Sequence, residues 1–375
     1  MSIPVISFFT GGGLLDLGLE QAGFSAAWTN EANAAIGDMY ESAMTTWRKS
    51  QSRRLPAARI SSRESIVDLK AAPILRSAFP KGRPEIFGVV GGPPCPDFSN
   101  GGTHNGHIGE NGKLTKTFVE MIMRLQPNFF LIENVAGLYV FRKHRKFLDR
   151  QIALLRKDGK YLVDTRLLNA LELGVPQKRE RVFIIGCRKR FAERALDRAI
   201  DWNESDWFPW PEVSAYSGAK NLRWPTTNRF RYTPKKPKGI PDELTVYSAL
   251  AGNGNPEELP NGLEYFNSYS EKFWQRDEGD VSGKSFKRLH RFRYSPTAWY
   301  GNREVHLHPW KPRRLSVRET LRIQSVPDEY VLPPDMSLSI KFQLICNGVP
   351  CRMAEHLGVE LKKFLEAGTK NIWTR

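Results

Sequence analysis

The sequence contains few cysteines and no long hydrophobic run, and both shortages limit what the protein can be. Only 4 of its 375 residues are cysteine, too few for a disulfide-stapled secreted domain. No segment reaches the roughly 18 apolar residues that a membrane-spanning helix needs. The first residues, 1–7, lack the basic and apolar regions of a signal peptide. The sequence therefore predicts a cytoplasmic protein that does not enter a membrane.

Acidic residues are scarce relative to basic ones. The chain has 56 Lys and Arg but 40 Asp and Glu, a formal net charge of +16, and the excess is spread along the chain. Positive charge distributed in this way favours a polyanionic partner, most often nucleic acid. An anionic membrane surface and ordinary solubility are the alternatives. With 40% hydrophobic residues, the chain can form a buried core and is not a disordered chain.

Short apolar runs that alternate with amphipathic stretches predict an α/β fold. Buried strands are expected at residues 5–9, 26–30, 86–90, 129–132 and 182–185. Helices are expected at residues 14–22, 118–125, 147–157, 316–324 and 351–365. This alternation is typical of βαβ units, in which helices cover both faces of a parallel sheet.

Residues 188–312 break this pattern. They are rich in Trp, Pro, Gly, Asn and Arg, they show weak periodicity, and they hold seven of the ten tryptophans. Because the periodic pattern returns afterwards, we predict that residues 1–187 and 313–375 form one α/β domain. A smaller, irregular domain is then inserted at residues 188–312.

A glycine-containing turn between the first expected strand and helix indicates a ligand site. The pattern is Phe9-x-Gly11-x-Gly13, and glycines there leave room for a ligand at the helix N-terminus. Glu31 ends the next strand, about 20 residues on, where a carboxylate can accept hydrogen bonds from ribose hydroxyls. The full Gly-x-Gly-x-x-Gly is absent, which favours a nucleoside such as S-adenosylmethionine over a dinucleotide. A tight connection without a ligand is the alternative.

Two further strand ends carry residues suited to chemistry. Cys95 follows the strand at 86–90 in a loop where neighbouring prolines fix the backbone and aim the thiol, which reacts as a thiolate. Glu133 ends the strand at 129–132. A partly desolvated carboxyl there has a raised pKa and can donate a proton. An inert cysteine and a solvated Glu133 are the simpler alternatives.

Two arginines precede the last expected strand. Arg179 and Arg181 alternate onto one face and suit contacts with phosphate or base edges, although a merely charged strand entry is equally common. The remaining cysteines, 187, 346 and 351, do not have the spacing of a metal site. We therefore expect no metal.

These motifs, in this order, resemble the cytosine-5 DNA methyltransferase family, in particular its prokaryotic or phage modification type. The resemblance covers about residues 4–187 and 296–366. The motifs are Gly92-Pro93-Pro94-Cys95, Glu133-Asn134-Val135, Gln177-Lys178-Arg179-Glu180-Arg181, residues 313–328 and Asn347-Gly348-Val349-Pro350. The family fold is a Rossmann-like S-adenosylmethionine-dependent catalytic domain, interrupted by a smaller target-recognition domain.

The resemblance assigns roles to individual residues. Cys95 would attack cytosine C6, Glu133 would contact N3 and N4, Arg181 would contact O2, and Arg179 would lie near a phosphate. The resemblance places the following residues around S-adenosylmethionine, whose product is S-adenosylhomocysteine: Phe9, Gly11, Gly13, Leu14, Glu31, Ser65, Ile66, Pro94, Leu114, Asn347 and Val349.

The implied substrate is a cytosine flipped out of a specific double-stranded DNA sequence. Candidate DNA contacts are Ser99, Arg179, Arg223, Arg229, Arg231, Arg288, Arg291 and Arg293. A monomer is expected, and a separately encoded restriction endonuclease is a candidate partner. The alternatives are an RNA cytosine-5 methyltransferase, or an inactive DNA-binding paralogue.

This sequence departs from the family pattern at four positions. Pro96 stands where Gln usually follows the nucleophile, Ser65 where Asp is common, Ala32 where an aromatic residue is frequent, and Cys346 where glycine is common. Because Cys95, Glu133 and Arg181 are all present, we expect activity.

Overall fold

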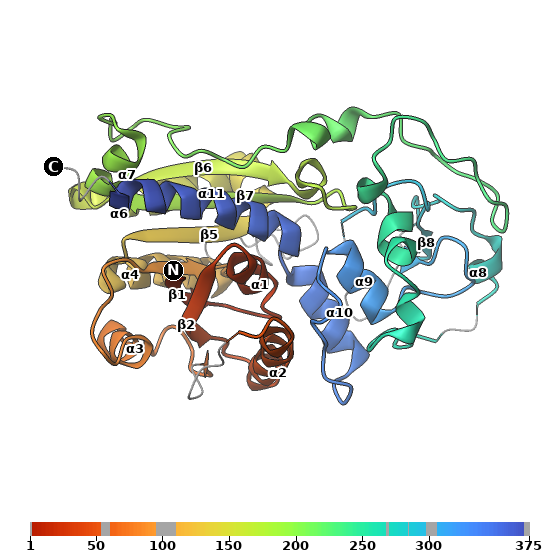
Figure 1. Ribbon diagram of the computed structural model, residues 1–375, viewed down its shortest axis with the longest axis horizontal. Coiled ribbons are helices and arrows are strands. Elements are labelled where there is room, and N and C mark those ends of the chain that lie inside the picture. Colours follow the sequence, from red (N-terminus) through yellow and green to blue (C-terminus); the bar gives the residue numbers. More distant parts are fainter. Residues whose placement is uncertain are drawn as a thin grey trace.

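A seven-stranded sheet lies at the centre of the protein in a computed structural model that describes residues 2–53, 61–94, 110–267, 270–283, 285–297 and 306–370 (Figure 1). The strand order is β3-β2-β1-β4-β5-β7-β6. The strands are β1 (Ile3–Phe8), β2 (Phe24–Asn30), β3 (Ser61–Ser62), β4 (Gly88–Gly91), β5 (Phe129–Val135), β6 (Tyr161–Asn169) and β7 (Glu180–Arg188).

Helices cover both faces of the sheet, as the sequence predicted. The described α-helices outside residues 197–316 are α1 (Leu14–Gln21), α2 (Ala34–Ser50), α3 (Ala71–Ala78), α4 (Glu110–Leu125), α5 (Ala136–Val140), α6 (Arg142–Arg156), α7 (Lys189–Leu196), α9 (Val317–Ile323), α10 (Leu338–Asn347) and α11 (Cys351–Lys370). Of these, α2, α9 and α10 pack with α1 in a separate cluster beside the sheet (Figure 1). Alternate residues of β5 enter opposite cores. Phe129 and Leu131 pack with α1, α7 and α11, whereas Phe130 and Ile132 pack with α3, α4 and α6.

The expectation of a parallel sheet is wrong at one strand. β1, β2, β3, β4 and β5 pair in parallel, but β7 runs antiparallel to both β5 and β6. Only residues 170–179 connect β6 to β7, which is too short for the crossover that two parallel strands require. The two strands therefore form a hairpin-like pair, and Val135 of β5 lies opposite Arg181 of β7.

Residues 197–316 contain little regular structure. The described elements there are short: a five-residue π-helix at Ser248–Gly252, the four-residue helix α8 (Lys272–Gln275), several three-residue 3-10 helices, and the two-residue strands β8 (Lys287–Arg288) and β9 (His306–Leu307). Trp207, Phe208 and Trp210 still pack in the sheet's core, whereas later residues form small clusters of their own. The division into two domains at residues 188 and 312 stays a prediction. No described helix is long and apolar enough to span a membrane.

Two arginines that the sequence assigned to DNA contact lie inside this irregular region instead. Arg288 is fully buried and donates hydrogen bonds to the carbonyl oxygens of four residues, Phe273, Arg276, His308 and Lys311. Arg291 donates to both carboxylate oxygens of buried Glu278. A region with few ladder hydrogen bonds needs such side chains to satisfy its buried carbonyl and carboxylate oxygens, so both arginines are structural.

Replacing Arg288 by alanine should destabilise the protein without altering its chemistry. The change leaves four carbonyl oxygens without this donor, and we expect the free energy of unfolding to fall by about 3 kcal/mol or more. Urea unfolding measures the effect. Arg223→Ala removes an exposed arginine and should change stability by less than about 0.5 kcal/mol. Equal effects of the two substitutions would contradict the structural role of Arg288.

Candidate active site

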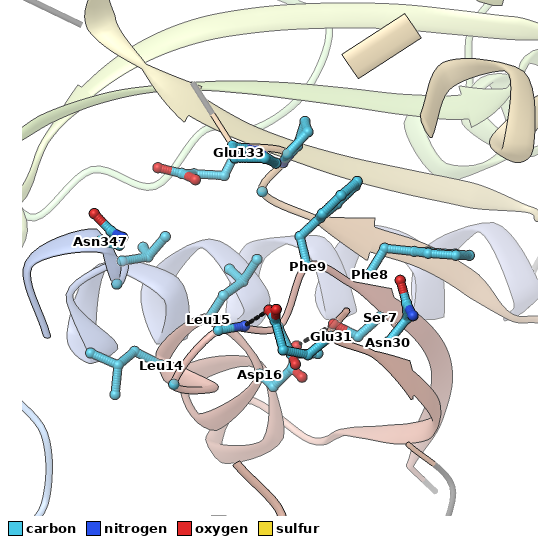
Figure 2. Close-up of a pocket in the computed structure, with 18 of the residues that line it drawn as sticks. Ser7, Phe8, Phe9, Leu14, Leu15, Asp16, Asn30, Glu31, Glu133 and Asn347 are labelled. Atoms are coloured by element: carbon cyan, nitrogen blue, oxygen red, sulfur yellow. Dashed lines mark hydrogen bonds between the residues drawn. The ribbon is translucent and has the colours of Figure 1, made fainter. Parts of the chain in front are cut away.

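A cavity of about 590 Å³ opens at the carboxyl ends of β1, β4 and β5, beside the start of α1 (Figure 2). Among the residues that the sequence assigned to a cofactor, those lining it are Phe9, Gly11, Leu14, Glu31, Ser65, Ile66, Pro94, Leu114, Asn347 and Val349. Glu133 and Arg181 line the same cavity. Of the assigned cofactor residues, Gly13 alone is not part of its wall. The volume of this cavity lies within the usual range for ligand-binding pockets.

The glycine turn gives the cavity its floor. Phe9, Gly11 and Gly13 all have a positive φ, of 54°, 51° and 78°, so the backbone turns sharply between β1 and α1. A Cβ on Gly13 would lie 2.7 Å from the ring of Tyr40, whereas one on Gly11 would meet no atom within 4 Å. Gly13 is therefore required for packing against α2, and Gly11 leaves open space at the cavity wall.

Backbone groups hold Glu31 in place at the end of β2. Its two carboxylate oxygens accept hydrogen bonds from the backbone N–H groups of Gly11 and Asn33, both at 3.0 Å. A carboxylate offers about four acceptor sites, so it retains capacity for hydroxyl groups of a ligand. In Figure 2, Glu31 lies on the lower side of the cavity and Glu133 on the upper side.

The two neighbouring antiparallel strands bring Glu133 and Arg181 together. Arg181 Nε lies 2.9 Å from Glu133 Oε1, and Glu133 is 8% exposed. Burial raises the pKa of Glu133, while the charges of Arg181 and Arg179 act in the opposite direction. The site therefore contains a carboxyl that can hold a proton more readily than an exposed glutamate, next to a fixed guanidinium.

The loop after β4 packs directly against Glu133. A Cβ on Gly92 would lie 2.7 Å from Glu133 Oε2, and the Asn134 amide donates a 3.4 Å hydrogen bond to the Pro93 carbonyl. Pro94 lines the cavity. The predicted nucleophile, Cys95, comes next in the chain but lies outside the described residues, as does Ser99.

Arg179 occupies a different place from the one expected of a phosphate contact. Its side chain is fully buried, and Nη2 donates a 2.6 Å hydrogen bond to the Cys346 carbonyl, one residue before Asn347. A buried guanidinium is not accessible to a duplex. Arg179 instead joins the entry of β7 to the end of α10, and so joins Arg181 to Asn347.

The other arginines assigned to DNA lie away from the cavity. Arg223, Arg229 and Arg231 are exposed, and Arg293 is partly exposed. The guanidinium of Arg231 lies 4.6 Å from the ring centroid of Trp274, and that of Arg229 lies 5.3 Å from that of Tyr232. These are cation–π distances, so this part of the surface combines positive charge with aromatic rings.

A buried cluster beneath the glycine turn was missed from the sequence. Asp16 accepts hydrogen bonds from Ser7 Oγ at 2.7 Å and Tyr40 Oη at 2.8 Å. Burial raises the pKa of Asp16 to about 6, despite these hydrogen bonds. Asp16 and Ser7 both line the cavity. An acidic residue in the first turn of a helix is ordinarily interpreted as a surface residue stabilised by the helix dipole. The sequence pattern therefore did not predict that Asp16 is buried.

The raised pKa of Asp16 should appear in the pH dependence of stability. Between the ordinary value of 3.8 and about 6, the folded protein binds more protons than the unfolded chain. The free energy of unfolding therefore falls as pH rises through this window. Asp16→Asn removes this titrating group. The free energy of unfolding of the variant, minus that of the unsubstituted protein, should therefore rise by about 2 kcal/mol from pH 4 to pH 7.

Urea titrations at several pH values measure this shift. Asp68→Asn, at an exposed position, is the matched control for the loss of one carboxyl group. A stability difference between Asp16→Asn and the unsubstituted protein that is constant over this range would contradict a raised pKa.

Comparisons with known proteins agree on one family. A family model described as C-5 cytosine-specific DNA methylase matches residues 3–363. The type II methyltransferase M.NmeDI of Neisseria meningitidis serogroup C is 41% identical over 374 residues, covering 96% of this chain and 84% of that protein. M.MthTI of Methanothermobacter thermautotrophicus, also a type II methyltransferase, is 29% identical and covers 98% of this chain and 99% of its own.

Solved structures share the fold at low sequence identity. The Dnmt2 methyltransferase of S. pombe has a TM-score of 0.57 at 12% identity, covering 95% of this chain and 96% of its own. The Entamoeba histolytica methyltransferase EhMeth has a TM-score of 0.58 at 13% identity, covering 97% and 98%. These likenesses concern the α/β architecture alone.

Proposed function

Since the chain belongs to the C-5 cytosine-specific DNA methylase family and is a DNA cytosine-5 methyltransferase, we propose that it methylates a flipped-out cytosine through a covalent bond to Cys95. The methyl donor is S-adenosylmethionine. One observation carries the proposal. The cavity lined by the glycine turn and Glu31 is also lined by Glu133, Arg181 and Pro94, the residue before Cys95.

The cavity fits the methyl donor in size and chemistry. Its volume of about 590 Å³ suits a nucleoside that carries an amino-acid chain. Glu31 presents a carboxylate for ribose hydroxyls, and Gly11 leaves space at the wall. The carboxyl of Asp16 lies at the base of the cavity and suits a positively charged ligand. When bound, S-adenosylmethionine supplies an electrophilic methyl group.

Glu133 and Arg181 act on the cytosine ring. The Cys95 thiolate forms a bond to C6, and the electron pair displaced from the ring reaches N3, where Glu133 supplies a proton. Arg181 stabilises negative charge on O2. The activated C5 then takes the methyl group, which leaves S-adenosylhomocysteine. Loss of the C5 proton to water releases the thiolate, and the N3 proton returns to Glu133, so that both the ring and the enzyme are restored.

The raised pKa of Glu133 supports this assignment. A carboxyl with an ordinary pKa is almost fully ionised near neutral pH and is a poor proton donor. Burial favours the protonated form, while Arg181 and Arg179 limit the shift. Arg181 thus has two tasks. It orients the carboxyl through the 2.9 Å contact, and it faces the same cavity with its positive charge.

Sequence recognition belongs to the irregular region. A cytosine within a duplex is stacked and inaccessible, so the protein must recover the cost of flipping it, a few kcal/mol, from contacts with DNA. We assign such contacts to Arg223, Arg229, Arg231 and Arg293, and exclude buried Arg288 and Arg291. The type II names of the relatives support a separately encoded restriction endonuclease as a partner. We propose that the enzyme acts as a monomer.

Replacing Cys95 by serine should abolish methyl transfer, because a serine hydroxyl ionises far less readily than a thiol at neutral pH. Incorporation of labelled methyl groups from S-adenosylmethionine into unmethylated λ DNA measures activity. DNA binding should persist. An active Cys95→Ser variant would rule out the covalent mechanism, and label that enters transfer RNA but not DNA would favour the RNA alternative.

Glu133→Gln should lower kcat by about 10²- to 10⁴-fold, the usual contribution of a general acid. The donor's Kd should stay nearly constant, because the substitution preserves side-chain shape. Single-turnover methyl transfer gives the rate, and equilibrium dialysis gives the affinity. Glu180→Gln, at an exposed position one residue before Arg181, is the control. A loss of donor affinity with unchanged kcat would contradict proton donation by Glu133.

A further inference from the structure

A basic surface lies where the chain leaves the catalytic strand. β5 ends at Val135, which lines the cavity, and α5 and α6 follow directly. We call the surface formed by Val140, Phe141, Arg142, Lys143, Lys146 and Arg150 the α5–α6 corner. All six residues are exposed, and the four basic side chains line one hollow together with Asp149.

The positive charge of this corner is not neutralised locally. Asp149 is the acid in the hollow, and its carboxylate already accepts a 2.9 Å hydrogen bond from Arg145, which is not among the four basic residues. Within the described part of the chain, no ion pair involves Lys143 or Lys146. Four uncompensated cations at neighbouring positions repel one another, so their juxtaposition destabilises the isolated helix unless an anion binds there.

The apolar residues of the corner give a second reason to expect a partner. Val140 is 60% exposed and Phe141 44% exposed, at the junction between the two helices. A purely solvated helix end has no need of two adjacent apolar side chains beside a basic cluster. Phosphates flanked by sugar carbons match this combination, because they present negative charge and apolar surface together.

The corner is close to the site along the chain. Val140 is five residues beyond Val135, and the helices start at the same carboxyl edge of the sheet as the cavity. A duplex whose cytosine reaches Glu133 must lie across this edge, with negative charges every 1.7 Å or so along its axis. The corner is separate from residues 197–316, where sequence recognition is expected.

We propose that the α5–α6 corner binds the phosphate backbone of the duplex that flanks the target cytosine. This proposal rests on the proposed function, since it takes double-stranded DNA as the substrate. The corner supplies affinity that does not depend on base sequence, and it contributes part of the binding free energy that offsets base flipping.

The test compares two double variants of equal charge change. Lys143→Gln/Lys146→Gln alters the corner. Lys81→Gln/Arg124→Gln removes two exposed cations at the opposite, amino edge of the sheet, near the starts of β4 and β5. The dissociation constant of a fluorescent duplex cut from unmethylated λ DNA is measured between 50 and 200 mM salt for both variants and for the unsubstituted protein.

Loss of two phosphate contacts should reduce the slope of log K against log salt by about 1 to 2 units for the corner variant only. Its Kd for S-adenosylmethionine should not change. Unchanged slope and affinity, or equal losses in both double variants, would overturn the proposal. Methyl transfer by the unsubstituted protein is scored separately. If that transfer fails while the corner variant still loses affinity, the proposed function is wrong and the DNA-binding surface stands.

Discussion

The ion pair between Glu133 and Arg181 is the contact on which the rest of the site depends. Burial alone would favour a neutral Glu133, and the nearby arginines alone would favour an ionised one. In the structure both effects act together, because the two side chains lie 2.9 Å apart and Glu133 is buried. That geometry comes from the pairing of β5 with β7, because a shift of one residue would turn either side chain to the other face of the sheet.

The same pair explains why the antiparallel strand matters. In a wholly parallel sheet, the residues before the last strand would lie at the amino edge, away from the ligand. Reversing β7 brings its start, with Arg179 and Arg181, to the carboxyl edge. From there Arg179 reaches the Cys346 carbonyl and fixes the end of α10. One reversed strand therefore brings together Glu133, Arg181 and the C-terminal wall of the cavity.

Much of this arrangement could be predicted from residue patterns, for physical reasons. Apolar runs between glycine turns identify buried strands, and acids or arginines at strand ends identify an edge where ligands bind. Strand direction could not be predicted, because it depends on the short connection between β6 and β7. The strand β6 was also missed, since Tyr161–Asn169 mixes apolar and polar residues without regular alternation.

Charge was the least reliable guide to individual roles. Arg288 and Arg223 look alike in the sequence, yet one satisfies four buried carbonyls and the other faces solvent. The difference depends on tertiary packing in a region without regular hydrogen-bond ladders. Asp16 shows the converse case. It sits in an ordinary helix start, and only the fold reveals that Ser7 and Tyr40 enclose it. The family motifs predict residues that line the cavity, but not the buried residues that support it.

The wall formed by Asn347 and Val349 has a consequence for the timing of biosynthesis. The cavity is completed by residues near position 350, while its floor is made by the first strand and helix. A ribosome must therefore translate most of the chain before the two parts can meet. Until then, the cavity of the nascent protein lacks the part of its wall that Asn347 and Val349 supply.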